Sequence, residues 1–112
     1  MRKLLLVPAL AATALATTVP PALSAREITV GDNYFVTPTG VPKVTVSKGT
    51  KVEWVWKKRT LHDVKAVKGP SKFGSDPQKG GSYTKKMKKK GTYTIICTIH
   101  GGSDQKMKLV VK

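Results

Sequence analysis

The chain has 112 residues, one cysteine, two histidines and a formal net charge of +15. This length allows one small domain after an export signal, and a single cysteine excludes an intrachain disulfide and a two-cysteine haem attachment. The positive charge favours anionic partners, but nucleic acid is not expected, because the protein is predicted to be exported and offers few aromatic side chains for stacking.

Residues 1–25 have the pattern of a secretory signal peptide. They begin with a short basic segment, continue through an apolar run over residues 4–16, and then become small and proline-containing. The apolar run is shorter than the roughly 20 residues that a transmembrane helix needs. Cleavage is expected after Ser24 or Ala25. A cut after Ala25 leaves residues 26–112 as one exported domain, located in the periplasm, outside the cell or at the cell envelope.

After this signal, short alternating apolar and polar stretches are separated by turn residues, without helical periodicity or internal repeats. This pattern predicts an all-β domain, an antiparallel β-sandwich of about seven strands. Residues 68–81 are expected to form a long surface connection, because they are rich in Gly, Pro, Ser and Lys. In chain order, the residues expected on inward strand faces are Ile28, Val30, Val44, Val46, Val52, Trp54, Trp56, His62, Val64, Ala66, Tyr93, Ile95, Cys97, Gln105, Met107, Leu109 and Val111.

The one thiol and both imidazoles fall where a single metal site can be assembled. Cys97 and His100 are three positions apart, and His62 lies at the expected start of an earlier strand. The glycines at positions 101 and 102 allow a sharp turn beside His100. A thiolate, two imidazoles and a weak fourth ligand suit copper that changes oxidation state, whereas zinc sites usually carry more cysteines or a third histidine. Exported domains of this size are often stabilised by disulfides or a bound metal, and without an intrachain disulfide the metal remains.

Residues 91–102, with the sequence GTYTIICTIHGG, resemble the C-terminal ligand loop of small blue copper proteins, the plastocyanin, amicyanin and pseudoazurin group. Four upstream stretches follow that group's order and spacing, so the resemblance covers nearly the whole chain after the signal. They are DNYF at 32–35, VTVSKG at 44–49, VEWV at 52–55 and LHDV at 61–64.

This resemblance implies a cupredoxin-like Greek-key β-sandwich, one type 1 copper and one-electron transfer, and therefore a carrier and not an enzyme. By motif match, it assigns His62 as the upstream histidine ligand, Cys97 as the thiolate and His100 as the downstream histidine.

The fourth ligand is where the chain departs from that group, which usually has a methionine there. Counting back from the inward-facing Leu109 and Val111 places the axial position on Gln105. Met107, the alternative, lies two residues further along the same face, roughly 7 Å deeper. A glutamine at this position resembles the stellacyanin branch. Because an amide oxygen is a harder ligand than a thioether and favours Cu(II), Gln105 predicts a lowered reduction potential.

The leading functional hypothesis is an exported, monomeric carrier of single electrons that exchanges them through the exposed edge of His100. The alternative is an envelope protein that binds or delivers copper with the same residues. The charge favours an acidic redox protein as partner, and an anionic envelope surface is a second candidate. The lysine-rich residues 85–90 also fit a charged strand edge that discourages sheet pairing. Asp63 is expected to orient the ligand loop by hydrogen bonds.

Overall fold

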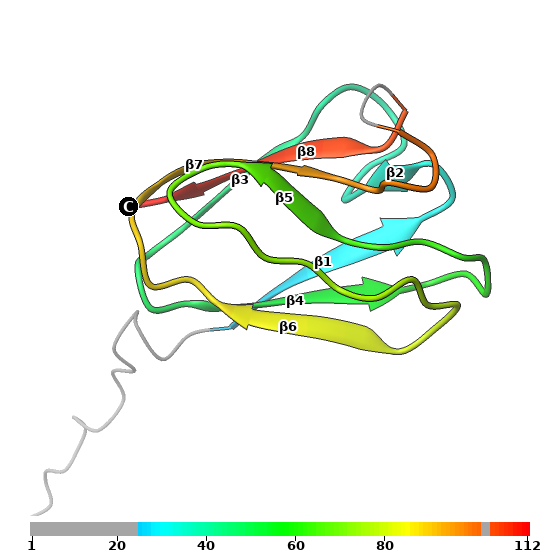
Figure 1. The fold of residues 1–112 in the computed structure, drawn as a ribbon, viewed down its shortest axis with the longest axis horizontal. Helices are drawn as coiled ribbons and strands as arrows, with labels where there is room; N and C mark the ends of the chain where they lie inside the picture. Colours follow the sequence, from blue (N-terminus) through cyan, green and yellow to red (C-terminus); the bar gives the residue numbers. More distant parts are fainter. Residues whose placement is uncertain (1–24, 102–103) are drawn as a thin grey trace, which may run out of the picture.

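Two four-stranded β-sheets face each other in the computed structural model, which describes residues 25–101 and 104–112 (Figure 1). The first sheet has the order β2-β1-β4-β6 and the second β3-β8-β7-β5. The predicted signal peptide lies outside the described residues apart from Ala25. Within the described ranges, no helix is long and apolar enough to cross a membrane. The strands are β1 (Ala25–Gly31), β2 (Tyr34–Phe35), β3 (Lys43–Val46), β4 (Lys51–Trp56), β5 (Lys65–Lys68), β6 (Ser82–Lys86), β7 (Gly91–Ile96) and β8 (Lys106–Val111).

The all-β sandwich predicted from the alternating stretches is confirmed, with two differences in detail. There are eight strands in the described residues, because the two-residue strand β2 pairs with the end of β1. Two strand pairs, β1 with β4 and β3 with β8, run parallel, so the sheets are mixed. From β2 to β7, each strand lies in the other sheet from the strand before it. Neighbouring strands within one sheet are therefore mostly distant in sequence. Alternation within a strand does not indicate whether it runs parallel or antiparallel to such a neighbour.

Strict alternation along the strands builds the core between the sheets. In β4, Val52, Trp54 and Trp56 are buried while the residues between them are not, and β8 repeats this with Met107, Leu109 and Val111. Side chains of a strand point to opposite faces in turn, so each strand buries one apolar face. The expected inward faces of both strands are therefore confirmed.

The connection over residues 68–81 packs against the core and pairs with the segment that carries His62. Phe73 packs against the core, with its ring centroid 6.0 Å from that of Trp54 and 5.9 Å from that of Tyr93. The Ala66 amide donates to the Phe73 carbonyl at 2.9 Å, and further on the segment pairs with His62. The connection therefore runs back beside β5 and supports the segment that leads into it.

The ends of four strands define the place of the functional site. In one sheet β1 and β4 end side by side, and in the other β7 ends where β8 begins. The hydrogen bond from Gln105 to Gly31 joins these two edges at one end of the sandwich (Figure 1). The turns over residues 47–50 and 87–90 lie at the opposite end, where they are joined by backbone hydrogen bonds (Figure 1). The first end carries His62, Cys97 and His100.

Candidate metal centre

His62 is held by backbone pairing with the long connection. Its amide donates to the Gln78 carbonyl at 3.0 Å, and the Gln78 amide donates back to the His62 carbonyl at 2.9 Å. The sequence pattern predicted that His62 begins a strand, but β5 starts only at Lys65, and His62 forms an isolated bridge. The predicted inward direction is confirmed, since only 1% of His62 is exposed.

Cys97 and His100 lie in the turn that follows β7. The Cys97 amide donates to the Gln105 carbonyl at 3.1 Å, which extends the β7–β8 ladder by one step. The Gly101 amide then donates to the Cys97 carbonyl at 2.9 Å and closes a tight turn around His100. Gly101 has a φ of 84°, a conformation that side chains with a Cβ rarely adopt, so the turn depends on this glycine.

Three ligand atoms converge at this end of the sandwich. The Nδ1 atoms of His62 and His100 are 3.2 Å apart, and the Cys97 Sγ lies 3.9 Å from the first and 3.6 Å from the second. A point equidistant from the three lies about 2.1 Å from each, which is close to the lengths of metal–imidazole and metal–thiolate bonds. His62 and Cys97 are buried and His100 is half-buried. The size and donor set of the cluster fit one metal ion.

Gln105 is placed beside this cluster and Met107 is not. The register that pairs Ile95 with Met107 brings Gln105 opposite Cys97, where the Cβ atoms of facing residues are roughly 5 Å apart. The fully buried Gln105 side chain donates from Nε2 to the carbonyls of Tyr34, at 2.9 Å, and Gly31, at 3.2 Å. Its Oε1 has no hydrogen-bond partner among the described residues. A buried acceptor without a partner costs stability unless a ligand uses it.

Asp63 connects the two segments that carry the cluster, as expected from its position after His62. Its backbone amide lies 3.5 Å from the Cys97 Sγ. Its buried carboxylate accepts a hydrogen bond from the Thr98 amide at 2.7 Å and another from the Thr98 hydroxyl. The amide contact offsets part of the charge of a thiolate, and the carboxylate contacts fix the segment that carries it.

Thr60 and Asp32 orient His62 from the other side, and the sequence reasoning missed both. The Thr60 Oγ1 lies 2.9 Å from His62 Nε2, the ring nitrogen that faces away from the cluster, and its hydroxyl donates to Asp32 Oδ1. This hydrogen bond from Thr60 is the main reason why the pKa of Asp32 lies below its ordinary value. A histidine whose outer nitrogen is bound in this way presents Nδ1 as a lone pair to a metal.

We expect Thr60→Val to weaken copper binding about 10- to 100-fold, the usual effect of losing an outer hydrogen-bond partner of a ligating histidine. Competition with a chelator of known affinity measures this change. Thr60→Ser keeps the hydroxyl and serves as the matched control, with affinity near that of the wild type. Equal copper affinity in Thr60→Val and wild type would show that the Thr60 hydroxyl does not orient His62.

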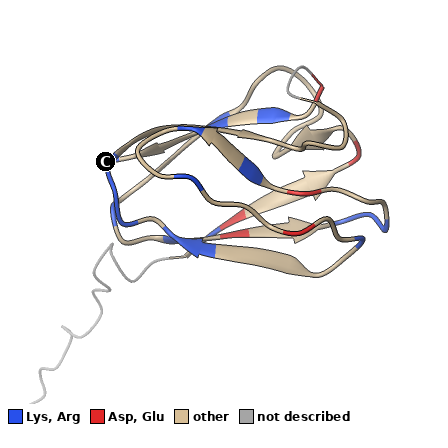
Figure 2. Cartoon of the chain, in the orientation of Figure 1, with Lys and Arg blue, Asp and Glu red and all other residues tan. Residues whose placement is uncertain are grey.

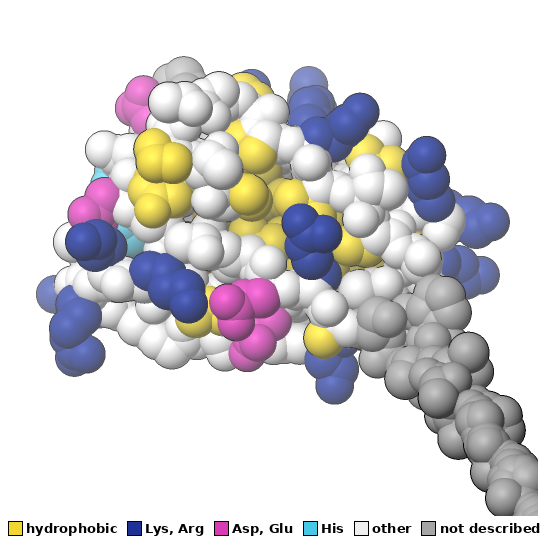
Figure 3. Space-filling model, turned by 180° about the vertical axis from the view of Figure 1, so that it is seen from behind, with side chains coloured by type: hydrophobic (Ala, Val, Ile, Leu, Met, Phe, Trp, Pro, Cys, Tyr) yellow, Lys and Arg dark blue, Asp and Glu magenta, His cyan; other side chains and the backbone are white. Residues whose placement is uncertain are grey.

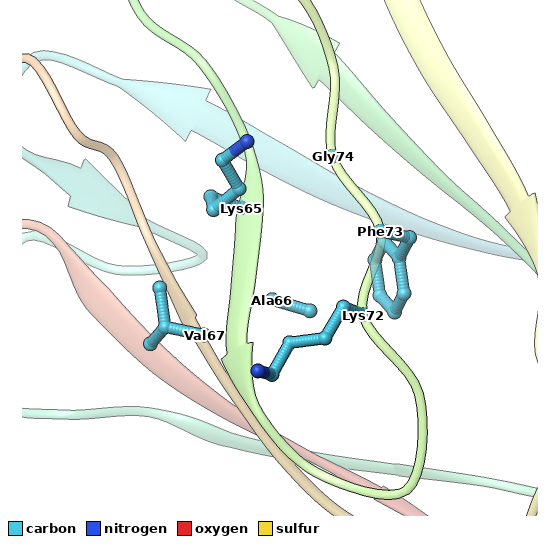
Figure 4. A pocket seen from close by; sticks show the side chains of 6 residues that line it. All are labelled: Lys65, Ala66, Val67, Lys72, Phe73 and Gly74. Carbon is cyan, nitrogen blue, oxygen red and sulfur yellow. The ribbon is translucent and has the colours of Figure 1, made fainter.

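A surface pocket lies apart from the metal centre. It has a volume of about 470 Å³ and lies between β5 and the connection over residues 68–81 (Figure 4). Its lining residues are Lys65, Ala66, Val67, Lys72, Phe73 and Gly74. None of them belongs to the His–Cys–His cluster, which is an internal site at the end of the sheets and not part of this depression.

A buried thiol and two imidazoles at one end of a β-sandwich define a small copper protein of the cupredoxin class. The chain belongs to the family of copper binding proteins described as the plastocyanin/azurin family, whose model matches residues 27–112. The family and the cluster together assign one type 1 copper to the chain. A comparison with curated protein sequences finds no match.

Solved structures of amicyanin have the same fold. A Cu(I) form of a variant in which glutamine replaces a methionine is 25% identical, with a TM-score of 0.65, and the match covers 80% of this chain and 83% of that one. An oxidized variant with lysine in place of a methionine is 23% identical, with a TM-score of 0.65 and coverage of 87% and 88%. These likenesses confirm the cupredoxin sandwich.

Proposed function

We propose that this protein is an exported carrier of single electrons, with its copper held by His62, Cys97 and His100 and by Gln105 as a weak fourth ligand. The observation that carries the proposal is the convergence of two Nδ1 atoms and one Sγ within 3.9 Å of one another. The unpartnered, buried Oε1 of Gln105 supports the fourth ligand, and its place opposite Cys97 favours it over Met107.

Copper bound in such a set supplies a one-electron couple between Cu(II) and Cu(I). The chain itself holds the ligands in one geometry for both states, through the paired backbone of His62 and the Asp63 contacts to Cys97 and Thr98. Burial of His62, Cys97 and Gln105 excludes water from the ligand atoms. Little therefore needs to reorganise when an electron arrives or leaves, and the proposal includes no bond-making chemistry.

The surface around His100 supports electron exchange at this end. His100 is the member of the cluster with an exposed edge, while His62 and Cys97 are buried. Leu61 and Ile99, the neighbours of the two histidines in sequence, are 41% and 42% exposed. Apolar side chains beside a redox site lose water readily when a partner binds, so a partner can approach closely here.

Export and the nature of the partner rest on the sequence. The pattern of residues 1–25 supports export to the periplasm or the cell exterior. The net charge of +15 supports an acidic redox protein as partner, with association rates that fall as the salt concentration rises.

Adding Cu(II) to the purified mature domain tests the copper site. We expect one equivalent to bind and to produce the intense visible absorption of thiolate-to-copper charge transfer. Repeated reduction and reoxidation in the presence of a chelator should leave the metal bound, because a carrier retains both oxidation states. Colourless binding, or loss of copper to the chelator in one oxidation state, would instead support the alternative, an envelope protein that stores or delivers copper.

A further inference from the structure

Six exposed lysines gather at the end of the sandwich opposite the metal centre. Two hydrogen bonds bring their segments together, from the Gly49 amide to the Met87 carbonyl at 2.6 Å and from the Met87 amide to the Thr50 carbonyl at 2.9 Å. We call this group the basic pole; it consists of Lys48, Lys51, Lys86, Lys88, Lys89 and Lys90.

The two turns of the basic pole contain basic residues and no acidic ones. Residues 47–51 and 85–91 contain no aspartate or glutamate, and none of the six lysines forms an ion pair within the part of the chain that the structure describes. Figure 2 shows two acidic residues close to the pole, Glu27 in β1 and Glu53 in β4, and others at the metal end. In Figure 3, the histidine end mixes basic and acidic side chains, whereas the opposite end shows basic ones alone.

The closely spaced positive charges of the basic pole lower the stability of the fold. The register of β4 with β6 puts Lys51 directly opposite Lys86, and like charges in facing positions destabilise a sheet. Protection of an exposed sheet edge explains Lys86, because β6 is an edge strand. It does not explain Lys48 or the lysines at positions 88–90, which lie in turns. A binding partner at this end accounts for all six.

We propose that the basic pole docks the protein on the anionic headgroups of a lipid bilayer, with the metal centre facing away from the membrane. Lysine side chains carry mobile point charges, which suit a fluid anionic surface. None of the exposed large apolar side chains lies in these turns, so the contact is electrostatic and reversible.

Two positions in the fold favour a membrane over an acidic protein at this pole. Ala25, where β1 begins, pairs with Lys51, so the segment preceding β1 joins the domain beside the basic pole. During export, before the predicted cleavage, this end of the domain is therefore the one nearest to the membrane. A redox protein docked here would lie a full strand length from the cluster, roughly 20 Å, which is a poor position for electron exchange.

Flotation of the copper-loaded protein with lipid vesicles tests the proposal. We expect binding to vesicles that contain roughly one third phosphatidylglycerol, no binding to pure phosphatidylcholine vesicles, and release at high salt. The triple variant Lys88→Gln, Lys89→Gln, Lys90→Gln should bind at least about tenfold more weakly. The matched control removes three charges at the metal end, Lys58→Gln, Arg59→Gln and Lys79→Gln, and should bind nearly as the wild type does.

Equal weakening in both triple variants would overturn the proposal, because net charge and not the pole would then control binding. Equal binding to neutral vesicles would also overturn it, and so would a lack of binding to anionic vesicles. Orientation has its own readout in the reduced, diamagnetic Cu(I) protein, since spin-labelled lipid should broaden the amide signals of residues 48–51 and 86–91 and leave those of residues 99–101 sharp. The reverse pattern would contradict the proposal. The copper spectrum is measured separately, so either result leaves the proposed electron-carrier function untouched.

Discussion

Replacing Cys97 with serine is expected to abolish the intense visible band of the copper-loaded protein and to lower its copper affinity by more than about 100-fold, beyond the loss that removal of an outer-sphere hydrogen bond causes. The Cys97 Sγ is the one sulfur of the His–Cys–His cluster, and the band arises from charge transfer out of a thiolate. A serine hydroxyl stays protonated at neutral pH and is a hard, weak ligand for Cu(I).

Visible absorption and chelator competition measure this result, and circular dichroism of the metal-free protein shows whether the sandwich still forms. Met107→Leu is the matched control, because it also removes a buried sulfur atom. Met107 lies in the core, on the same strand face as Gln105. The control should keep the band. A band of unchanged intensity in Cys97→Ser would mean that Cys97 is not the copper ligand.

The second large effect is expected from Gln105→Met, which should raise the reduction potential by more than about 60 mV, a tenfold change in the one-electron equilibrium constant. A thioether stabilises Cu(I) relative to Cu(II), whereas the amide oxygen of Gln105 does the opposite. The variant also loses the hydrogen bonds from Nε2 to the Tyr34 and Gly31 carbonyls, so its stability should fall by about 1–3 kcal/mol.

Protein voltammetry on wild type, Gln105→Met and Met107→Leu separates the two candidates for the fourth ligand. If Gln105 is the ligand, only its replacement shifts the potential strongly, because Met107 lies opposite Ile95 in the core. An unchanged or lowered potential in Gln105→Met would refute the assignment. A large shift of the reduction potential in Met107→Leu would show instead that Met107 is the fourth ligand.

Much of the cluster could be predicted from the sequence because its signals are local. Strand parity turns Cys97 inward together with Tyr93 and Ile95, and it places both Gln105 and Met107 on the inward face of the last strand. Counting back along that face from Leu109 and Val111 places Gln105 nearer to the cluster than Met107. These rules apply within one strand and need no knowledge of its neighbours. The all-β class follows from the same alternation.

The hydrogen bonds around the cluster could not be predicted in this way. Asp32 lies 30 positions before His62 and reaches it only because β1 and β4 pair in parallel and end together. The connection over residues 68–81, with Gln78 paired to His62 and Phe73 packed against the core, was expected to be a surface segment. Contacts of this kind join residues with no periodic relation, so no local pattern indicates them.

By itself, the sequence determined the fold class, the identity of the candidate ligands and the total charge, because strand alternation, residue type and composition are properties of the chain alone. Only the tertiary structure decided which donor atoms converge, how Thr60 and Asp32 hold His62, and that the lysines of two distant turns gather opposite the metal centre. Those features depend on the pairing of strands far apart in sequence, and that pairing is set by how two sheets bury their apolar faces together.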